Sequence, residues 1–171
     1  MRIRDFIETN YSHFNAGELA RCIGSLREFL DGGGRLMITL AGAMSTAEIG
    51  KSLAPAIRSQ KVHAICCTGA NLEEELFGLF SRSEYEHVPN WRHQSKEEDA
   101  ELHQRGMNRV TDVAIPESTF TKVGDSLMSL WEESEAVGDS RFPHEYVYDL
   151  LLHGDFEVSS APEDSWLVAA A

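Results

Sequence analysis

Residues 62–76 read VHAICCTGANLEEEL, and this stretch decides the fold class. Its first six residues form a short apolar run with strand-favouring side chains, which predicts a buried β-strand over 62–67. Apolar residues then recur at the spacing of one helix face, which predicts a helix over 72–81 with Asn71 as its N-cap. The three glutamates after Leu72 therefore fall in the first turn of a helix that leaves a buried strand.

The preceding segment repeats this order of elements. Residues 35–40 (RLMITL) read as a strand, residues 41–46 (AGAMST) as a turn of small residues, and the following residues as a helix to about residue 59. Pro55 within that helix predicts a kink or a boundary. A strand, a helix and a second strand of the same kind form the βαβ unit of a parallel sheet, so we predict an α/β domain.

Further elements are expected on both sides of this unit. Helices are predicted over 15–30, 95–105, 116–131 and 143–153, and a third strand over 110–115. The helix over 15–30 carries one apolar face, formed by Leu19, Cys22, Ile23, Leu26 and Leu30. The apolar residues after Pro162 have two interpretations: a C-terminal helix docked on the core, or, as we favour, the front portion of a longer chain.

The composition limits the class of function. The chain has 171 residues, a formal net charge of −13 and 42 % hydrophobic residues, so we expect one ordered domain. The charge argues against nucleic acid as a partner and is compatible with a cationic substrate or a basic protein, although many soluble proteins are acidic for solubility alone. No segment approaches the roughly 20 apolar residues of a membrane span, and no secretion signal is seen. The three cysteines and the scattered histidines lack the spacing of a disulfide framework or a metal site, so we expect a cytoplasmic protein without a metal.

Both predicted turns lie at the carboxyl ends of parallel strands, where α/β proteins bind ligands. The small residues of 41–46 let a ligand approach the backbone, and free N–H groups of the next helix can bind an anion. The acids after Gly69 can pair with an ammonium group or accept hydrogen bonds from a ribose. Each feature also has an ordinary explanation, because close packing selects small residues and the helix dipole stabilises acids in a first turn.

Five segments occur in order along the chain: LAGAMSTAEIG (40–50), CTGANLEEEL (67–76), VPNWR (88–92), RGMNRVTDVAIPE (105–117) and PEDSW (162–166). Together they resemble the N-terminal portion of the deoxyhypusine synthase family, in particular its bacterial deoxyhypusine synthase-like branch. The resemblance implies a Rossmann-like parallel sheet flanked by helices, forming a single, apparently incomplete domain over residues 1–171 of a homotetramer. It also implies an NAD-dependent aminobutyltransferase that oxidises spermidine. The acceptor of the aminobutyl group is a lysine of the hypusine-bearing translation factor, or a free diamine such as putrescine, which gives homospermidine.

By position, the resemblance assigns NAD contacts to both turns and polyamine contacts to an acidic pair. The NAD-binding residues are Gly42, Ala43, Met44, Ser45 and Thr46 in the first turn, Thr68, Gly69 and Ala70 in the second, and Glu74. The polyamine-binding residues are Glu73 and Glu74, which leaves Glu75 for the helix end. Better-known members carry Ser and Asn where this chain has Gly42 and Ala43, so side-chain hydrogen bonds to the cofactor are lost there.

The resemblance assigns no catalytic residue within these 171 residues, because the family's catalytic lysine and acid–base histidine lie in its back half. The lysines that do not match that motif are Lys51, Lys61, Lys96 and Lys122. The chain alone is therefore expected to be catalytically incomplete. Two alternatives stay open: a non-catalytic NAD- or polyamine-binding or regulatory partner of a full-length paralogue, and an unrelated small α/β nucleotide-binding protein.

Overall fold

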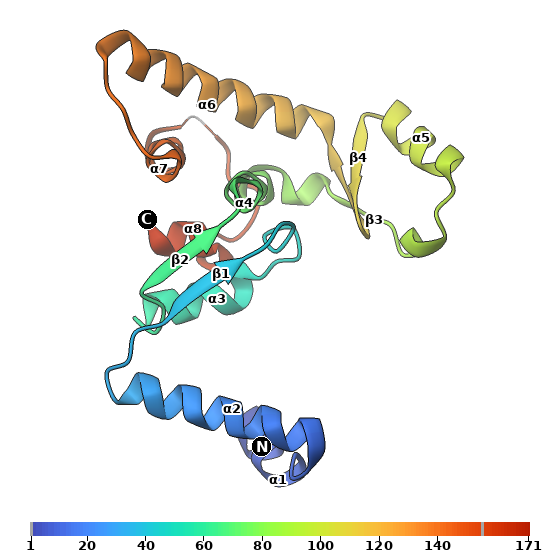
Figure 1. The fold of residues 1–171 in the computed structure, drawn as a ribbon. Helices are drawn as coiled ribbons and strands as arrows, with labels where there is room; N and C mark the ends of the chain where they lie inside the picture. Colours follow the sequence, from blue (N-terminus) through green and yellow to red (C-terminus); the bar gives the residue numbers. More distant parts are fainter. Residues whose placement is uncertain (1, 155) are drawn as a thin grey trace.

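A parallel pair of strands lies at the centre of the molecule. The computed structural model describes residues 2–154 and 156–171. Strands β1 (Met37–Leu40) and β2 (Ala64–Cys67) pair in parallel, with Met37 opposite Ala64 and Leu40 opposite Cys67, and α3 (Gly50–Arg58) connects them. Figure 1 shows this βαβ unit between the helices. The fold is therefore α/β and of the Rossmann-like type, with two parallel strands in the described residues.

Helices from distant parts of the chain enclose the core beside this unit. Helix α4 (Gly69–Ser81) follows β2, and α6 (Glu117–Val137) and α7 (Pro143–His153) pack on it. The last helix, α8 (Trp166–Ala170), follows the 3₁₀ turn η3 (Pro162–Asp164) and lies against α3. The side chains of Leu76, Val123 and Leu167 are almost fully enclosed. The C-terminal residues thus dock on the core, as the first of the two interpretations expects.

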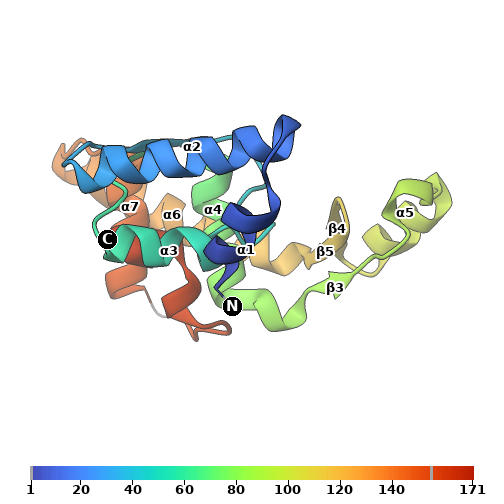
Figure 2. The ribbon, with the colours of Figure 1, turned by 90° about the horizontal axis from the view of Figure 1, so that it is seen from below.

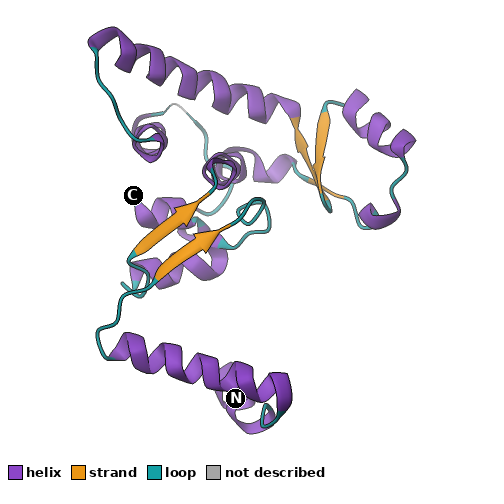
Figure 3. Cartoon of the chain, viewed as in Figure 1, coloured by secondary structure: helices purple, strands orange, loops and turns teal. Residues whose placement is uncertain are grey.

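A small antiparallel sheet forms an arm that projects from this core (Figures 1 and 2). Its strand order is β3 (Glu86–His87), β5 (Val113–Pro116) and β4 (Met107–Val110), and η1 (Arg82–Glu84) leads into it. Helix α5 (Lys96–Gln104) follows η2 (Trp91–His93) and is held on β4 by a two-pronged ion pair between Arg109 and Asp99, at 2.6 and 2.8 Å. Figure 3 shows the two separate groups of strands.

The single strand predicted over 110–115 is wrong, because that segment contains a hairpin turn. Val110 pairs with Val113, so the polar residues Thr111 and Asp112 form the tip between β4 and β5. Thr111 has a φ of 55°, in the left-handed region that ends a strand. The segment therefore belongs to the antiparallel arm and adds no third strand to the parallel sheet.

Two N-terminal helices lie apart from the core in Figure 1. Helix α1 (Ile3–Asn10) was not predicted, and α2 (Phe14–Asp31) matches the helix predicted over 15–30. Only Gly17 of α2 is buried, and the apolar face that includes Leu19, Ile23 and Leu26 is largely exposed. The sequence period thus predicts the helix correctly, but within the described residues the face remains uncovered.

The expectation of a buried strand over 62–67 is also wrong. Cys66 is exposed and Cys67 is half-buried, because β2 pairs only with β1 among the described residues and its other edge is open. The three cysteines are free thiols. In the part of the chain that the structure describes, no helix is both long enough and apolar enough to span a bilayer.

Candidate functional site

The first turn (residues 41–46) and the second turn (residues 68–71) lie side by side at the carboxyl ends of β1 and β2. Several hydrogen bonds join the first turn to the second turn and to Glu74 just after it. The backbone N–H of Ser45 donates to Oδ1 of Asn71 at 3.1 Å, and the backbone N–H of Thr46 donates to Oε2 of Glu74 at 3.2 Å. Parallel pairing places both strand ends at one edge of the sheet, so residues 26 and 28 positions apart meet here.

Asn71 has a different role from the N-cap predicted for it. Helix α4 begins at Gly69 with Thr68 as its N-cap, so Asn71 lies inside the first turn. Its side chain is fully buried. The amide oxygen accepts a hydrogen bond from the backbone N–H of Ser45, and the amide nitrogen donates to the carbonyl of Ala41 and to Oγ1 of Thr68. The side chain therefore ties the first turn to the second.

The earlier start of α4 also changes the interpretation of the three glutamates. No acid lies in the first turn of the helix, so favourable interaction with the helix N-terminus does not explain them. Glu73 is exposed, Glu74 is half-buried against the first turn, and Glu75 is buried. Partial burial, followed by the negative charge of Glu74, raises the pKa of Glu73 above its ordinary value. The three carboxylates thus face three different environments, as their helical spacing predicts.

Glu75 anchors a distant segment, and its assignment to the helix end is wrong. Its side chain is only 6 % exposed, and Oε1 accepts a hydrogen bond from the backbone N–H of Trp166 at 3.0 Å. Burial raises the pKa of Glu75, while the nearby hydroxyls of Ser165 and Ser45 and the hydrogen bond from the Trp166 N–H oppose that increase. This carboxylate therefore holds the start of α8 rather than facing an open ligand site.

The raised pKa of Glu75 gives a prediction for stability against pH. In the folded state this carboxyl keeps its proton above 4.5, its ordinary pKa, whereas the unfolded chain has already released it. The folded state then binds more protons, so this contribution is complete below pH 4.5 and is lost as pH rises through the folded pKa. A Glu75→Gln variant should lack this loss. Urea unfolding of both proteins from about pH 4 to 7 measures it, and a difference between them that does not change with pH would contradict it.

The open part of the site lies between the hydrogen-bonded anchors. Gly42 is exposed and Ala43 and Met44 are half-buried, and within the described residues their three backbone N–H groups make no recorded hydrogen bond. Ala43 has a φ of 63°, a left-handed conformation that is rare for alanine. A Cβ placed on Gly42 or on Gly69 meets no atom within 4 Å, so open space adjoins both turns. Alternation between ordinary and left-handed residues turns successive N–H groups towards one side, which suits an anion.

The remaining predicted residues lie at the same edge. Thr68 and Gly69 are exposed and Ala70 is half-buried, whereas Ser45 and Thr46, at the end of the first turn, are buried. Ser45 and Thr46 also use their backbone N–H groups within the protein. The structure therefore brings all the predicted residues together, and it leaves residues 42–44, 68–70, 73 and 74 at least partly accessible.

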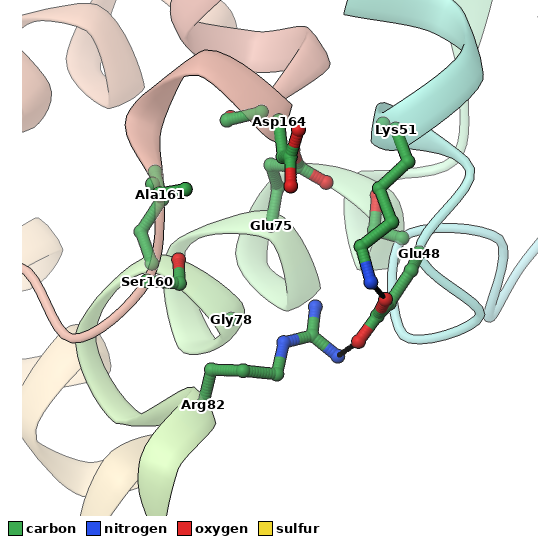
Figure 4. A pocket seen from close by; sticks show the side chains of 12 residues that line it. Glu48, Lys51, Glu75, Gly78, Arg82, Ser160, Ala161 and Asp164 are labelled. Atoms are coloured by element: carbon green, nitrogen blue, oxygen red, sulfur yellow. Dashed lines mark hydrogen bonds and ion pairs between the residues drawn. The ribbon is translucent and has the colours of Figure 1, made fainter.

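A charged cavity of about 170 Å³ lies behind the first turn, between α4 and residues 160–165 (Figure 4). Glu75 and Asp164 lie on one wall and Arg82 on the opposite one, while Lys51 pairs with Glu48 beside them. Arg82 also pairs with Glu48, at 3.3 Å. Lys51 and Arg82 thus share Glu48 as their ion-pair partner.

Sequence reasoning missed Arg82 and Trp166, two residues that hold this region together. Arg82 lies seven positions after Glu75, directly after the end of α4, and this helical spacing is a signal that the sequence does offer. Its guanidinium also donates to the carbonyl of Thr46 at 3.4 Å. Trp166 reaches Ser45 across 121 positions, and no local pattern predicts such a contact.

The family model described as deoxyhypusine synthase matches residues 6–171, which is nearly the whole chain. Among curated proteins, no relative matches. Within the described residues, no group of three or more His, Cys, Asp or Glu side chains is placed to hold a metal ion.

Proposed function

The chain belongs to the deoxyhypusine synthase family, and from this premise we propose that it forms the NAD- and polyamine-binding corner of an NAD-dependent aminobutyltransferase. Family membership supports aminobutyl transfer in general terms. The observation that supports the specific proposal is the adjacency of two unlike turns. One presents unused backbone N–H groups, and the other is followed by the carboxylates of Glu73 and Glu74.

The first turn is suited to the phosphate groups of NAD. The N–H groups of Gly42, Ala43 and Met44 are free among the described residues, and the missing side chain at Gly42 leaves room for close approach. The loss of Ser and Asn side chains at 42 and 43 therefore leaves backbone contacts available. Thr68, Gly69 and Ala70 would line the other side. When bound, NAD would supply the hydride acceptor for oxidation of the polyamine.

The acidic pair is suited to a protonated amine. Glu73 and Glu74 repel one another, which is part of the reason that the pKa of Glu73 is raised. An ammonium group placed between them would relieve this repulsion and would favour both charged forms. Neither carboxylate forms an ion pair with another described residue, so both are available to spermidine or putrescine.

We propose that the reactive lysine comes from polypeptide outside these 171 residues. Lys51 is paired with Glu48 and Lys61 lies 3.7 Å from Asp31, so neither is a desolvated free amine near the two turns. The acceptor of the aminobutyl group would be a lysine of a translation factor or a free diamine. A homotetramer in the cytoplasm completes the proposal, and the free cysteines and the exposed apolar face of α2 are compatible with it.

A non-catalytic partner of a full-length paralogue is the second candidate. This candidate is favoured because no lysine among these 171 residues matches the family's catalytic motif. A non-catalytic partner would keep both turns without catalysing the reaction. Co-purification with a full-length protein whose activity changes on binding would support this candidate.

Calorimetric titration with NAD and with spermidine tests the proposal, together with an assay for NADH formation. We expect saturable binding of both ligands, with no NADH formed by the chain alone. NADH formation by the 171 residues alone would contradict an external lysine. Binding of neither ligand would contradict the proposed function.

A further inference from the structure

A buried hydrogen-bonded cluster fixes the first turn from below. Ser45 is its centre: Oγ donates to the backbone carbonyl of Asn71 at 2.9 Å and accepts from Nε1 of Trp166 at 2.9 Å. The side chains of Asn71, Ser45 and Trp166 are 0 %, 1 % and 2 % exposed, so water does not replace these bonds. The cluster thus joins the first turn, α4 and α8 in a region closed to solvent.

Hydrogen bonds to Asn71 hold the backbone on both sides of the accessible residues 42–44. Asn71 holds the carbonyl of Ala41 before the open stretch and the N–H of Ser45 after it. Between these points lies Ala43, whose left-handed conformation is unfavourable for alanine. A strained residue of this kind persists only where the surrounding contacts determine it. The cluster supplies such contacts at both ends of residues 42–44.

We infer that Asn71 and Trp166 are positioning residues that hold the backbone of residues 42–44 in its ligand-binding conformation. The inference rests on the proposed function, because these side chains act on the nicotinamide cofactor through the turn and do not themselves face the open site. Trp166 makes the site depend on α8, which lies far away in the sequence. The hydrogen bond from its indole N–H to Oγ of Ser45 makes this connection.

Trp166→Phe tests the inference with an aromatic replacement. The variant keeps most of the aromatic packing and removes the Nε1 donor to Ser45. Two controls accompany it: Trp131→Phe, at a half-exposed tryptophan of α6, and Val123→Ala, which weakens the buried core without touching the first turn. Asn71→Asp gives a second variant, because it keeps an acceptor for Ser45 but removes the donor to Ala41.

Two measurements are made on all five proteins. The first is the Kd for NAD, and the second is amide hydrogen exchange of the segment 41–49. We expect Trp166→Phe and Asn71→Asp to weaken NAD binding by about 5- to 10-fold, which is the effect of one net hydrogen bond, and to speed exchange in that segment. Val123→Ala should leave both unchanged, even though its global stability falls.

Different failures have different meanings. If the unaltered chain does not bind NAD, the proposed function fails, and the exchange measurement still decides the positioning role. Unchanged exchange and unchanged NAD affinity in both Trp166→Phe and Asn71→Asp would overturn the inference. Equal effects from Val123→Ala would also overturn it, because they would show that general loss of stability is the cause.

Discussion

A Leu167→Ala variant is expected to lose about 3 kcal/mol of unfolding free energy. The side chain of Leu167, on α8, is 0 % exposed and belongs to the main core, where α8 lies against α3. Removing it deletes buried methyl groups and leaves a cavity that the surrounding helices fill only in part, and such substitutions cost roughly 2–5 kcal/mol. Urea denaturation followed by circular dichroism measures the change.

The matched control is Leu152→Ala near the end of α7. Leu152 is 68 % exposed, so the same deletion should change the unfolding free energy by no more than about 0.5 kcal/mol. Similar losses at both positions would show that α8 does not dock as described. The comparison matters for function because Trp166, the neighbour of Leu167, reaches the first turn.

The central fold follows from local patterns that the sequence contains. The strand-forming runs before Ala41 and Thr68 predict β1 and β2, and the helical spacing after Leu72 predicts α4; the structure has all three elements there. The position of both turns at one edge follows as well, because parallel strands place their carboxyl ends together. These features depend on residues within a few positions of one another, which is why the sequence predicts them.

Features that depend on tertiary contacts could not be predicted in this way. Glu75 looks like its two neighbours in the sequence, but its partner is the N–H of Trp166, 91 positions later. Asn71 is a residue type that favours the N-cap position, but its side chain instead accepts a hydrogen bond from Ser45 and so links the second turn to the first. The polar pair Thr111 and Asp112 interrupts an apolar run of strand-forming residues, and only the pairing of Val110 with Val113 reveals a hairpin. The spacing of apolar residues in α2 predicts a helix but does not predict what covers its apolar face.

The buried position of Glu75 changes which substitutions can test the acidic pair. Replacing Glu75 would alter the anchor of α8, so it is no control for a ligand contact. Glu132, an exposed glutamate of α6, is a better control because it lies outside both turns. Glu74 is the informative position, because its carboxylate belongs to the proposed polyamine site and also accepts a hydrogen bond from the N–H of Thr46.

Glu74→Gln is expected to weaken spermidine binding by about 10-fold, whereas Glu132→Gln should leave it within about twofold. The amide oxygen of Gln can still accept from Thr46, so the first turn keeps its anchor and only the negative charge is lost. Binding of NAD should therefore change less than binding of spermidine. Calorimetric titration at low and high salt measures both affinities, and the difference between the two proteins for spermidine should shrink as salt screens the charge. Equal losses for NAD and spermidine would show that Glu74 acts as a structural anchor alone, and no loss for spermidine would remove Glu74 from the polyamine site.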